Sequence, residues 1–109
     1  MAQALGHFEQ AVLLAVRSLG EDAYGRAVIR AIETRWPSRV SPGAVYATLD
    51  RLETQQLLQS TLGSGTPERG GRPRRFYAIT TTGLAALNAT RELQDALWSG
   101  LPWPLKGHS

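Results

Sequence analysis

The 109-residue sequence predicts a mainly α-helical fold with one small β-hairpin. Three observations support this fold class. Apolar residues recur at helical spacing in the first half of the chain, two short apolar segments flank a glycine-rich stretch, and helical spacing returns from about residue 80. Three compact helices, a hairpin and a last helix follow one another in the order of a winged helix-turn-helix with an added C-terminal helix.

The first predicted helix carries an apolar stripe and two further leucines. The stripe consists of Leu5, Phe8, Val12, Ala15, Val16 and Leu19. Leu13 and Leu14 lie off this stripe, so the helix is expected to be buried on more than one side. A second helix is expected from an N-cap at Asp22 to Trp36, because the residue before Pro37 is pushed out of the α-helical conformation.

The third predicted helix, residues 41–56, has two start signals that agree. Ser41 can cap the first turn with its hydroxyl, and Pro42 suits the first helical position, where no backbone donor is required. The apolar stripe of this helix is narrow and consists of Val45, Leu49 and Leu52. Capping therefore explains Ser41 without a catalytic role.

Two strands and one helix complete the predicted fold. They are expected at residues 57–62 and 75–79 for the strands, and from Thr80 or Thr81 to about Trp98 for the helix. Residues 1–80 are assigned to the winged-helix domain and residues 81–109 to the C-terminal helix and tail. The two parts are expected to form one compact unit, which is what a chain of this length supports.

The composition excludes several classes of protein chemistry. The chain has no cysteine, which excludes disulfides, thiolate metal sites and cysteine catalysis, and its two histidines stand near opposite ends of the sequence. It contains no zinc-binding His-Glu motif, no nucleophile elbow, no dinucleotide fingerprint and no phosphate-binding loop. We therefore expect no enzyme activity, no cofactor and no metal.

The sequence shows no feature of a membrane or exported protein. Its longest apolar run, Ala11 to Val16, is far shorter than a membrane span, and no basic stretch precedes an apolar one near the N-terminus. With 42% hydrophobic and 19% charged residues, the composition is that of a globular protein. We expect a cytoplasmic protein that has no membrane partner.

Positive charge is concentrated in the middle of the sequence. The net charge is +3 and the isoelectric point is near 10.0. Residues 35–80 contain seven arginines against three acids, whereas the flanking regions are close to neutral. A polyanion would be expected to contact this central part. The preference for arginine over lysine suits phosphate and guanine contacts but fits a GC-rich genome equally well.

The third helix has features of a helix that enters a DNA groove. Its first turns hold small residues, which let a backbone approach closely, beside the large polar-tipped Tyr46. The small residues are Pro42, Gly43, Ala44 and Ala47. The Tyr46 hydroxyl can reach a phosphate or a base edge, and its ring can lie against a sugar. The same small residues would also suit close packing against another helix, so the helix alone does not decide.

The segment between the two strands favours the DNA interpretation. Residues 69–75 contain no acid and four arginines, which are Arg69, Arg72, Arg74 and Arg75. So many like charges are costly to hold together unless a polyanion neutralises them. The Gly-Arg-Pro core at 71–73 resembles a thin hook that carries arginine into a minor groove. The wing, residues 63–75, is therefore expected at the minor groove or the backbone, and a merely solvated charged loop is the alternative.

The last predicted helix has more apolar surface than one small domain can bury. Leu84 and Leu87 lie on the face expected to seal the core. The opposite stripe consists of Ala86, Ala89, Leu93 and Leu97. We expect this stripe to pair across a homodimer together with Leu13 and Leu14 of the first helix. The alternative is that the tail folds back over the stripe.

Two segments resemble the PadR family of bacterial transcriptional regulators. They are SPGAVYATLDRLE at 41–53 and GRPRRFYAITTTG at 71–83, and AYGRAVIRAIE at 23–33 extends the similarity to about residues 8–87. The length is similar to that of short-form members, whose single C-terminal helix dimerises. The resemblance implies a homodimeric repressor that binds a roughly palindromic operator in double-stranded DNA.

The resemblance also implies roles for individual residues. It maps Ser41, Pro42, Gly43 and Tyr46 onto contacts of the recognition helix, and Arg72, Arg74 and Arg75 onto the wing. Some members release DNA when a planar aromatic compound binds at the dimer interface. By this resemblance Trp98 is the candidate for contact with such an effector.

Two positions depart from the family pattern. Arg26 stands where a large aromatic residue is common, and Gln56 stands where glycine is common. If Gln56 takes a positive φ, it costs ~1 kcal/mol relative to glycine. Neither position belongs to the expected DNA face.

A function of a different class stays open at this point. A winged-helix domain can serve as an adaptor that binds another protein and never contacts DNA. Salt dependence separates the two functions, because binding through several phosphates weakens steeply as salt rises and an apolar protein contact does not.

Overall fold

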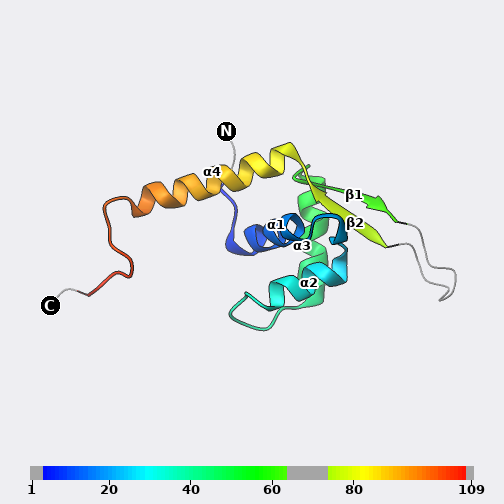
Figure 1. The fold of residues 1–109 in the computed structure, drawn as a ribbon, viewed down its shortest axis with the longest axis horizontal. Helices are drawn as coiled ribbons and strands as arrows, with labels where there is room; N and C mark the ends of the chain where they lie inside the picture. Colours follow the sequence, from blue (N-terminus) through cyan, green and yellow to red (C-terminus); the bar gives the residue numbers. More distant parts are fainter. Residues whose placement is uncertain (1–3, 64–73, 108–109) are drawn as a thin grey trace.

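The structure, a computed structural model, describes residues 4–63 and 74–107 and confirms the predicted fold class. Its elements are α1 (His7–Leu19), a 3₁₀ turn (Gly20–Asp22), α2 (Gly25–Glu33), α3 (Pro42–Thr54), β1 (Leu58–Leu62), β2 (Arg75–Ile79) and α4 (Thr81–Trp98). Figure 1 shows the first three helices packed together, with the hairpin on one side and α4 extending toward the other end of the molecule.

The core lies between the three short helices and the hairpin. Its fully buried side chains include Val12, Leu13, Val28, Val45, Leu49, Leu52 and Leu58. Burying one such side chain stabilises the fold by about 1.5–3 kcal/mol, so this cluster fixes how α3 is oriented. The strands pair antiparallel from Leu58 opposite Ile79 to Leu62 opposite Arg75.

The predicted start of α2 is wrong. Asp22 belongs to the 3₁₀ turn, and the N-cap is Tyr24, whose backbone is extended. The reason lies in the hairpin: the carbonyl of Ala23 accepts from the Tyr77 amide at 2.8 Å, and Tyr24 forms a bridge with Phe76. Residues 23–24 are therefore an additional short pairing along β2, and α2 can begin only after them.

The end of α2 also differs from the prediction. The helix stops at Glu33, three residues before Trp36. Trp36 is half-buried and packs edge-on against Phe8 of α1, with ring centroids 5.1 Å apart. This aromatic contact holds the connection between α2 and α3 against α1.

The start of α3 is confirmed. The Ser41 Oγ accepts from the Ala44 amide at 3.3 Å, and Pro42 is the first helical residue. The narrow apolar stripe is also confirmed, because Val45, Leu49 and Leu52 are fully buried. The helix therefore packs against the core along one side, through this stripe.

The end of α3 explains the unusual glutamine. The amide of Leu57 donates to the Leu52 carbonyl and the amide of Gln56 donates to the Glu53 carbonyl, both at 2.9 Å. This pair of bonds is a Schellman motif, which requires a left-handed residue at its turn. Gln56 supplies it with φ of 65°, so the cost expected for a residue other than glycine is present.

The α4 helix begins where the sequence predicts, but its core face is wider than expected: Leu87 packs against the core as predicted, Leu84 is half-buried, and Ala86 is buried as well. The Thr80 Oγ1 caps it by accepting from the Gly83 amide at 2.9 Å. The buried face runs through Gly83, Ala86 and Thr90. Gly83 lies so close to the Leu57 carbonyl that a Cβ atom would collide with it. This close approach turns Ala86 inward.

Beyond its first turns α4 leaves the core. The molecule measures 65 Å along its longest axis, and Figure 1 shows α4 and the tail forming an arm along it. Within the described parts of the chain, no helix combines the length and apolar character needed to cross a membrane.

Candidate nucleic-acid interface

The first turns of α3 form a small exposed surface. Every residue from Ser41 to Ala47 is exposed except Val45, which is fully buried. Pro42, Gly43 and Ala44 leave the backbone accessible, as the sequence predicts. Another molecule could therefore approach the helix closely along these turns.

Tyr46 is the large side chain of this surface and is 46% exposed. Its ring lies against the first residue of α2, Gly25, where an added Cβ atom would stand 2.5 Å from Cε1 and 2.8 Å from Oη of the tyrosine. The absence of a side chain at Gly25 therefore makes room for the Tyr46 ring in this position. This role of Gly25 was not predicted from the sequence. The one signal that pointed to it was the presence of a glycine directly after Tyr24.

The base of the wing adds two arginines to the same part of the molecule. Arg74 is exposed, and its guanidinium carbon lies 4.3 Å from the centroid of the Tyr24 ring. Arg75 is also exposed, and its Nη1 donates to the Ser60 Oγ at 2.8 Å. Arg69 and Arg72, the other two arginines expected in the wing, lie outside the described residues.

A polar network links Arg75 to the end of α3. The Ser60 hydroxyl on β1 donates in turn to the Glu53 carboxylate. Next to this network, burial raises the pKa of the Tyr77 hydroxyl, and the nearby negative charge of Asp50 adds to the shift. The network ties the base of the wing to the C-terminal end of α3, the helix whose first turns are exposed.

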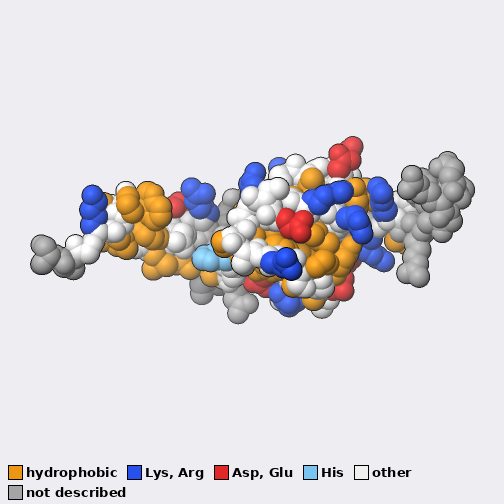
Figure 2. All heavy atoms as spheres, turned by 90° about the horizontal axis from the view of Figure 1, so that it is seen from below, with side chains coloured by type: hydrophobic (Ala, Val, Ile, Leu, Met, Phe, Trp, Pro, Cys, Tyr) orange, Lys and Arg blue, Asp and Glu red, His pale blue; other side chains and the backbone are white. Residues whose placement is uncertain are grey.

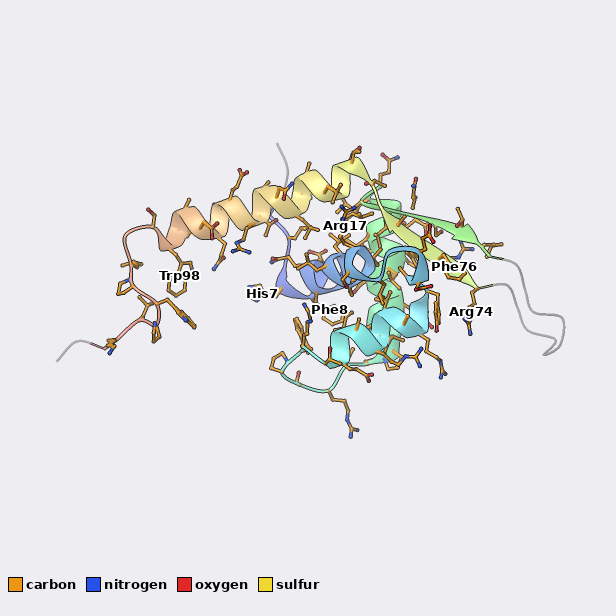
Figure 3. All side chains as sticks on the ribbon, in the orientation of Figure 1. His7, Phe8, Arg17, Arg74, Phe76 and Trp98 are labelled. Carbon is orange, nitrogen blue, oxygen red and sulfur yellow. The ribbon has the colours of Figure 1, made fainter. Side chains whose placement is uncertain are left out.

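The globular part and the arm differ in the side chains that cover most of their visible surface. Figure 2 shows several Lys and Arg side chains on the globular part, whereas hydrophobic side chains cover much of the visible arm. Figure 3 shows Arg74 and Phe76 at the hairpin end of the molecule and Trp98 on the distant arm. Trp98 is half-buried and packs edge-on against Trp103 at 5.9 Å.

The structure changes which residues are available for a contact between two chains. Leu13 is fully buried and Ala86 is 6% exposed, so both belong to the core of one chain and are not surface residues as expected. Leu14, Leu93 and Leu97 are 51%, 46% and 67% exposed. Ala89 is half-buried. The exposed apolar stripe is therefore narrower on α4 than the sequence predicts.

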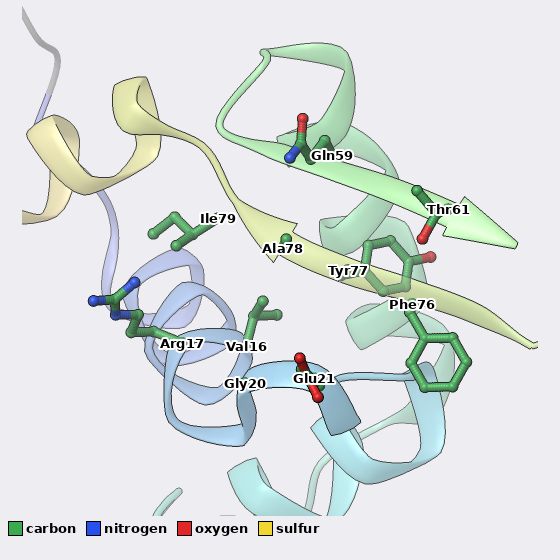
Figure 4. Close-up of a pocket in the computed structure, with 10 residues that line it drawn as sticks. All are labelled: Val16, Arg17, Gly20, Glu21, Gln59, Thr61, Phe76, Tyr77, Ala78 and Ile79. Carbon is green, nitrogen blue, oxygen red and sulfur yellow. The ribbon is translucent and has the colours of Figure 1, made fainter. Parts of the chain in front are cut away.

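Two hollows lie away from the exposed turns of α3. One groove of about 550 Å³ runs between the end of α1 and β2, with Val16, Arg17, Phe76 and Ile79 in its lining (Figure 4). A second hollow of about 400 Å³ lies between α1 and α2 beside Leu14 and Trp36. Trp98 lines neither. Among the described residues, no group of three or more acidic or histidine side chains could hold a metal ion.

Comparison with known proteins agrees with this geometry. The family model described as "Transcriptional regulator PadR-like family" matches residues 12–89. The transcriptional regulator Rv3488 of Mycobacterium tuberculosis is 44% identical over 61 residues, which are 54% of this chain and 51% of that protein. The chain thus spans about half the length of this curated relative.

Solved structures show the same fold. A PadR-like transcriptional regulator from Bacillus cereus is 25% identical and superposes with a TM-score of 0.71, covering 93% of each chain. A PadR family transcriptional regulator from Eggerthella lenta is 27% identical with a TM-score of 0.64, covering 83% of this chain and 76% of that one. Members of this family are DNA-binding transcriptional regulators and not enzymes. The match over residues 12–89 shows that the chain belongs to the PadR-like family of transcriptional regulators.

Proposed function

We propose that this regulator is a homodimeric repressor that reads a pseudo-palindromic operator, with α3 in the major groove and the wing at the minor groove or the backbone. The observation that carries the proposal is the exposed first part of α3. From Ser41 to Ala47 only Val45 is buried, so the side of the helix that a groove would receive is free of contacts to the core. A helix must present such a surface to reach base edges.

The proposed contacts of α3 follow from the chemistry of its first turns. Pro42 and Gly43 let the helix approach the bases and the sugar-phosphate backbone closely. The Ser41 Oγ, which caps the helix, and the Tyr46 hydroxyl are polar groups at the rim of this surface. Hydroxyls bind phosphate oxygens and base edges, so they would set the position of the helix in the groove.

The wing is proposed to add charge and a second groove contact. Arg74 is exposed at its base, and Arg75 lies beside it with one nitrogen bound to Ser60. Arg69 and Arg72 are assigned to the wing contact from the sequence. Arginine suits phosphate, and it also suits the narrow minor groove of A·T-rich DNA.

The dimer is proposed to form through the arm. Leu93 and Leu97 are large exposed apolar residues on α4, and Leu14 offers a third on α1. A two-fold axis would bury these stripes against each other, as isologous interfaces do. In this proposal residues 1–80 bind DNA and residues 81–109 dimerise. Two such domains would read half-sites about one helical turn, roughly 34 Å, apart.

Two further parts of the proposal come from the function and the family resemblance. A protein that binds DNA in this way would act in the cytoplasm. Contact between Trp98 and an aromatic effector stays a prediction.

A mobility shift with the DNA upstream of the protein's own coding region tests the proposal. We expect binding to that fragment at lower protein concentration than to a random fragment of equal length. The logarithm of the affinity should fall linearly with the logarithm of the salt concentration, by about 0.9 per neutralised phosphate. Equal and salt-independent retention of both fragments would refute sequence-specific DNA binding and favour the adaptor function.

A further inference from the structure

Tyr24 lies between two arginines from different elements. The guanidinium carbon of Arg74, before β2, lies 4.3 Å from the centroid of the Tyr24 ring. From α2, the Nη2 atom of Arg30 donates to the Tyr24 hydroxyl at 3.1 Å. One aromatic side chain therefore contacts one guanidinium with its ring face and a second guanidinium with its oxygen.

The Tyr24 ring is also held in place by a contact with Phe76 of β2. Phe76 packs against it edge-on, with centroids 5.8 Å apart, and the backbones of the two residues form a bridge. The Tyr24 amide also donates to the Asp22 carbonyl at 3.0 Å. Figure 3 shows Phe76 and Arg74 together at the same end of β2. Because its support comes from β2, the ring links α2 to the base of the wing.

The two guanidiniums gather positive charge on the surface. Arg30 and Arg74 are both exposed, and the ion pairs found among the described residues, Arg51–Glu9 and Arg91–Asp95, use neither of them. Two like charges held near one ring repel each other unless an anion lies between or beside them. Guanidinium groups bind phosphate oxygens in a fixed geometry, which makes a phosphate the fitting anion.

This cluster is continuous with the exposed turns of α3. Tyr24 directly precedes Gly25, and the Tyr46 ring lies against Gly25. The Arg30–Tyr24–Arg74 cluster therefore borders the surface that would enter the major groove. A duplex seated on α3 presents the phosphates at the edge of its groove to the neighbouring protein surface.

We propose that Tyr24 is a positioning residue that holds Arg30 and Arg74 together as one binding site for a phosphate of the DNA backbone. The site rests on the proposed binding of DNA by α3 and adds Tyr24 and Arg30 to its interface. The ring holds the Arg74 guanidinium before DNA arrives, so less side-chain freedom is lost on binding. Substitution of Tyr24 should therefore weaken binding although its ring need not contact DNA.

Titrations of the full chain with operator DNA over a series of salt concentrations test this site. Arg30→Ala and Arg74→Ala should each weaken binding about tenfold. The double variant Arg30→Ala/Arg74→Ala, which leaves the phosphate without a guanidinium, should lower the salt slope by about one unit. Arg91→Ala is the matched control, because it removes the same charge from an exposed helix position on α4. It should leave affinity and slope close to those of the parent.

Coupling between the residues separates positioning from a merely structural role. Tyr24→Leu should weaken binding about tenfold. The loss in the double variant Tyr24→Leu/Arg74→Ala should be smaller than the sum of the two single losses, because only the Arg30 part of the Tyr24 effect is left once Arg74 is gone. Tyr24→Phe keeps the ring under Arg74 and removes only the contact to Arg30, so it should restore most of the loss. Thermal unfolding measured in parallel shows whether each variant is folded. If Tyr24→Leu is not folded, Tyr24→Phe measured with and without Arg30→Ala carries the test, because the lost hydroxyl should cost affinity only while Arg30 is present.

The outcomes distinguish this site from the proposed function. If the parent binds operator DNA but the double variant Arg30→Ala/Arg74→Ala keeps its affinity and its salt slope, the phosphate site is refuted and the DNA-binding function stands. Strictly additive losses in the double variant Tyr24→Leu/Arg74→Ala would equally refute the positioning role of Tyr24. A parent that binds no DNA fragment would overturn both proposals together.

Discussion

Replacing Gly25 by alanine tests whether the position of Tyr46 on α3 matters for DNA binding. The added Cβ atom would stand 2.5 Å from Cε1 and 2.8 Å from Oη of Tyr46, closer than non-bonded atoms in proteins stand. These tyrosine atoms are at the far end of a side chain that is 46% exposed. We therefore expect the tyrosine side chain to rotate away while the backbone keeps its place.

The two effects of Gly25→Ala differ in size. Alanine is favoured over glycine in a helix by about 0.5–1 kcal/mol, and displacing a side chain from its rotamer costs a similar ~0.5–1.5 kcal/mol. The free energy of unfolding should thus change by no more than about 1 kcal/mol. A lost hydrogen bond between the Tyr46 hydroxyl and a charged phosphate costs about 1.5–3 kcal/mol, which corresponds to at least about tenfold weaker DNA binding.

Fluorescence anisotropy with a labelled operator and thermal unfolding of the same samples measure the two effects. Tyr46→Phe, which removes only the hydroxyl, should weaken binding as much as Gly25→Ala, and the double variant should be no weaker than either. Gly6→Ala is the control, because its Cβ would meet only an ordinary contact, with Glu9 Oε1 at 3.5 Å. If folded Gly25→Ala binds the operator as tightly as the parent, the Tyr46 hydroxyl has no place in the DNA contact.

Three further predictions concern the rest of the molecule. Gln56→Gly should raise the free energy of unfolding by about 1 kcal/mol in urea titrations, because φ is 65° there; no gain would mean that the turn is unstrained. Leu97→Glu should yield monomers in sedimentation, and a monomeric parent at micromolar concentration would exclude the dimer. Because burial raises the pKa of Tyr77, the unfolded state loses that proton first as pH rises through about 10. The free energy of unfolding should therefore fall above this pH, and it should fall less in Tyr77→Phe. An equal fall in the parent and in Tyr77→Phe would contradict this reasoning.

The sequence by itself determined the elements whose signals are local. Ser41 and Pro42 predict the start of α3, and Thr80 predicts the cap of α4, because a cap depends on residues within one turn. The limits of β2 and the order of all elements follow in the same way from apolar spacing and turn residues. Together these local signals specify the winged-helix fold and the exposed first turns of α3.

Contacts between residues far apart in the sequence determined where α2 begins and which face of α4 is buried. The start of α2 moves because Ala23 and Tyr24 pair with β2, more than fifty residues later in the sequence. The core face of α4 turns toward Ala86 because Gly83 lies against the Leu57 carbonyl. Neither contact leaves a trace in local periodicity, since both depend on how complete elements pack.

The candidate DNA surface shows the same division. The residues of the first turns of α3 and the arginines of the wing were predictable from chemistry, because small side chains and arginines at these positions favour a polyanion. Tyr24, Gly25 and Arg30 were not predicted as parts of this surface. The arrangement of the residues was not predictable. The Tyr46 ring lies against Gly25, and Tyr24 contacts Arg74, only because α2, α3 and the hairpin meet there. Residue type determines which groups can bind a phosphate, whereas tertiary packing determines which of them stand close enough to bind the same one.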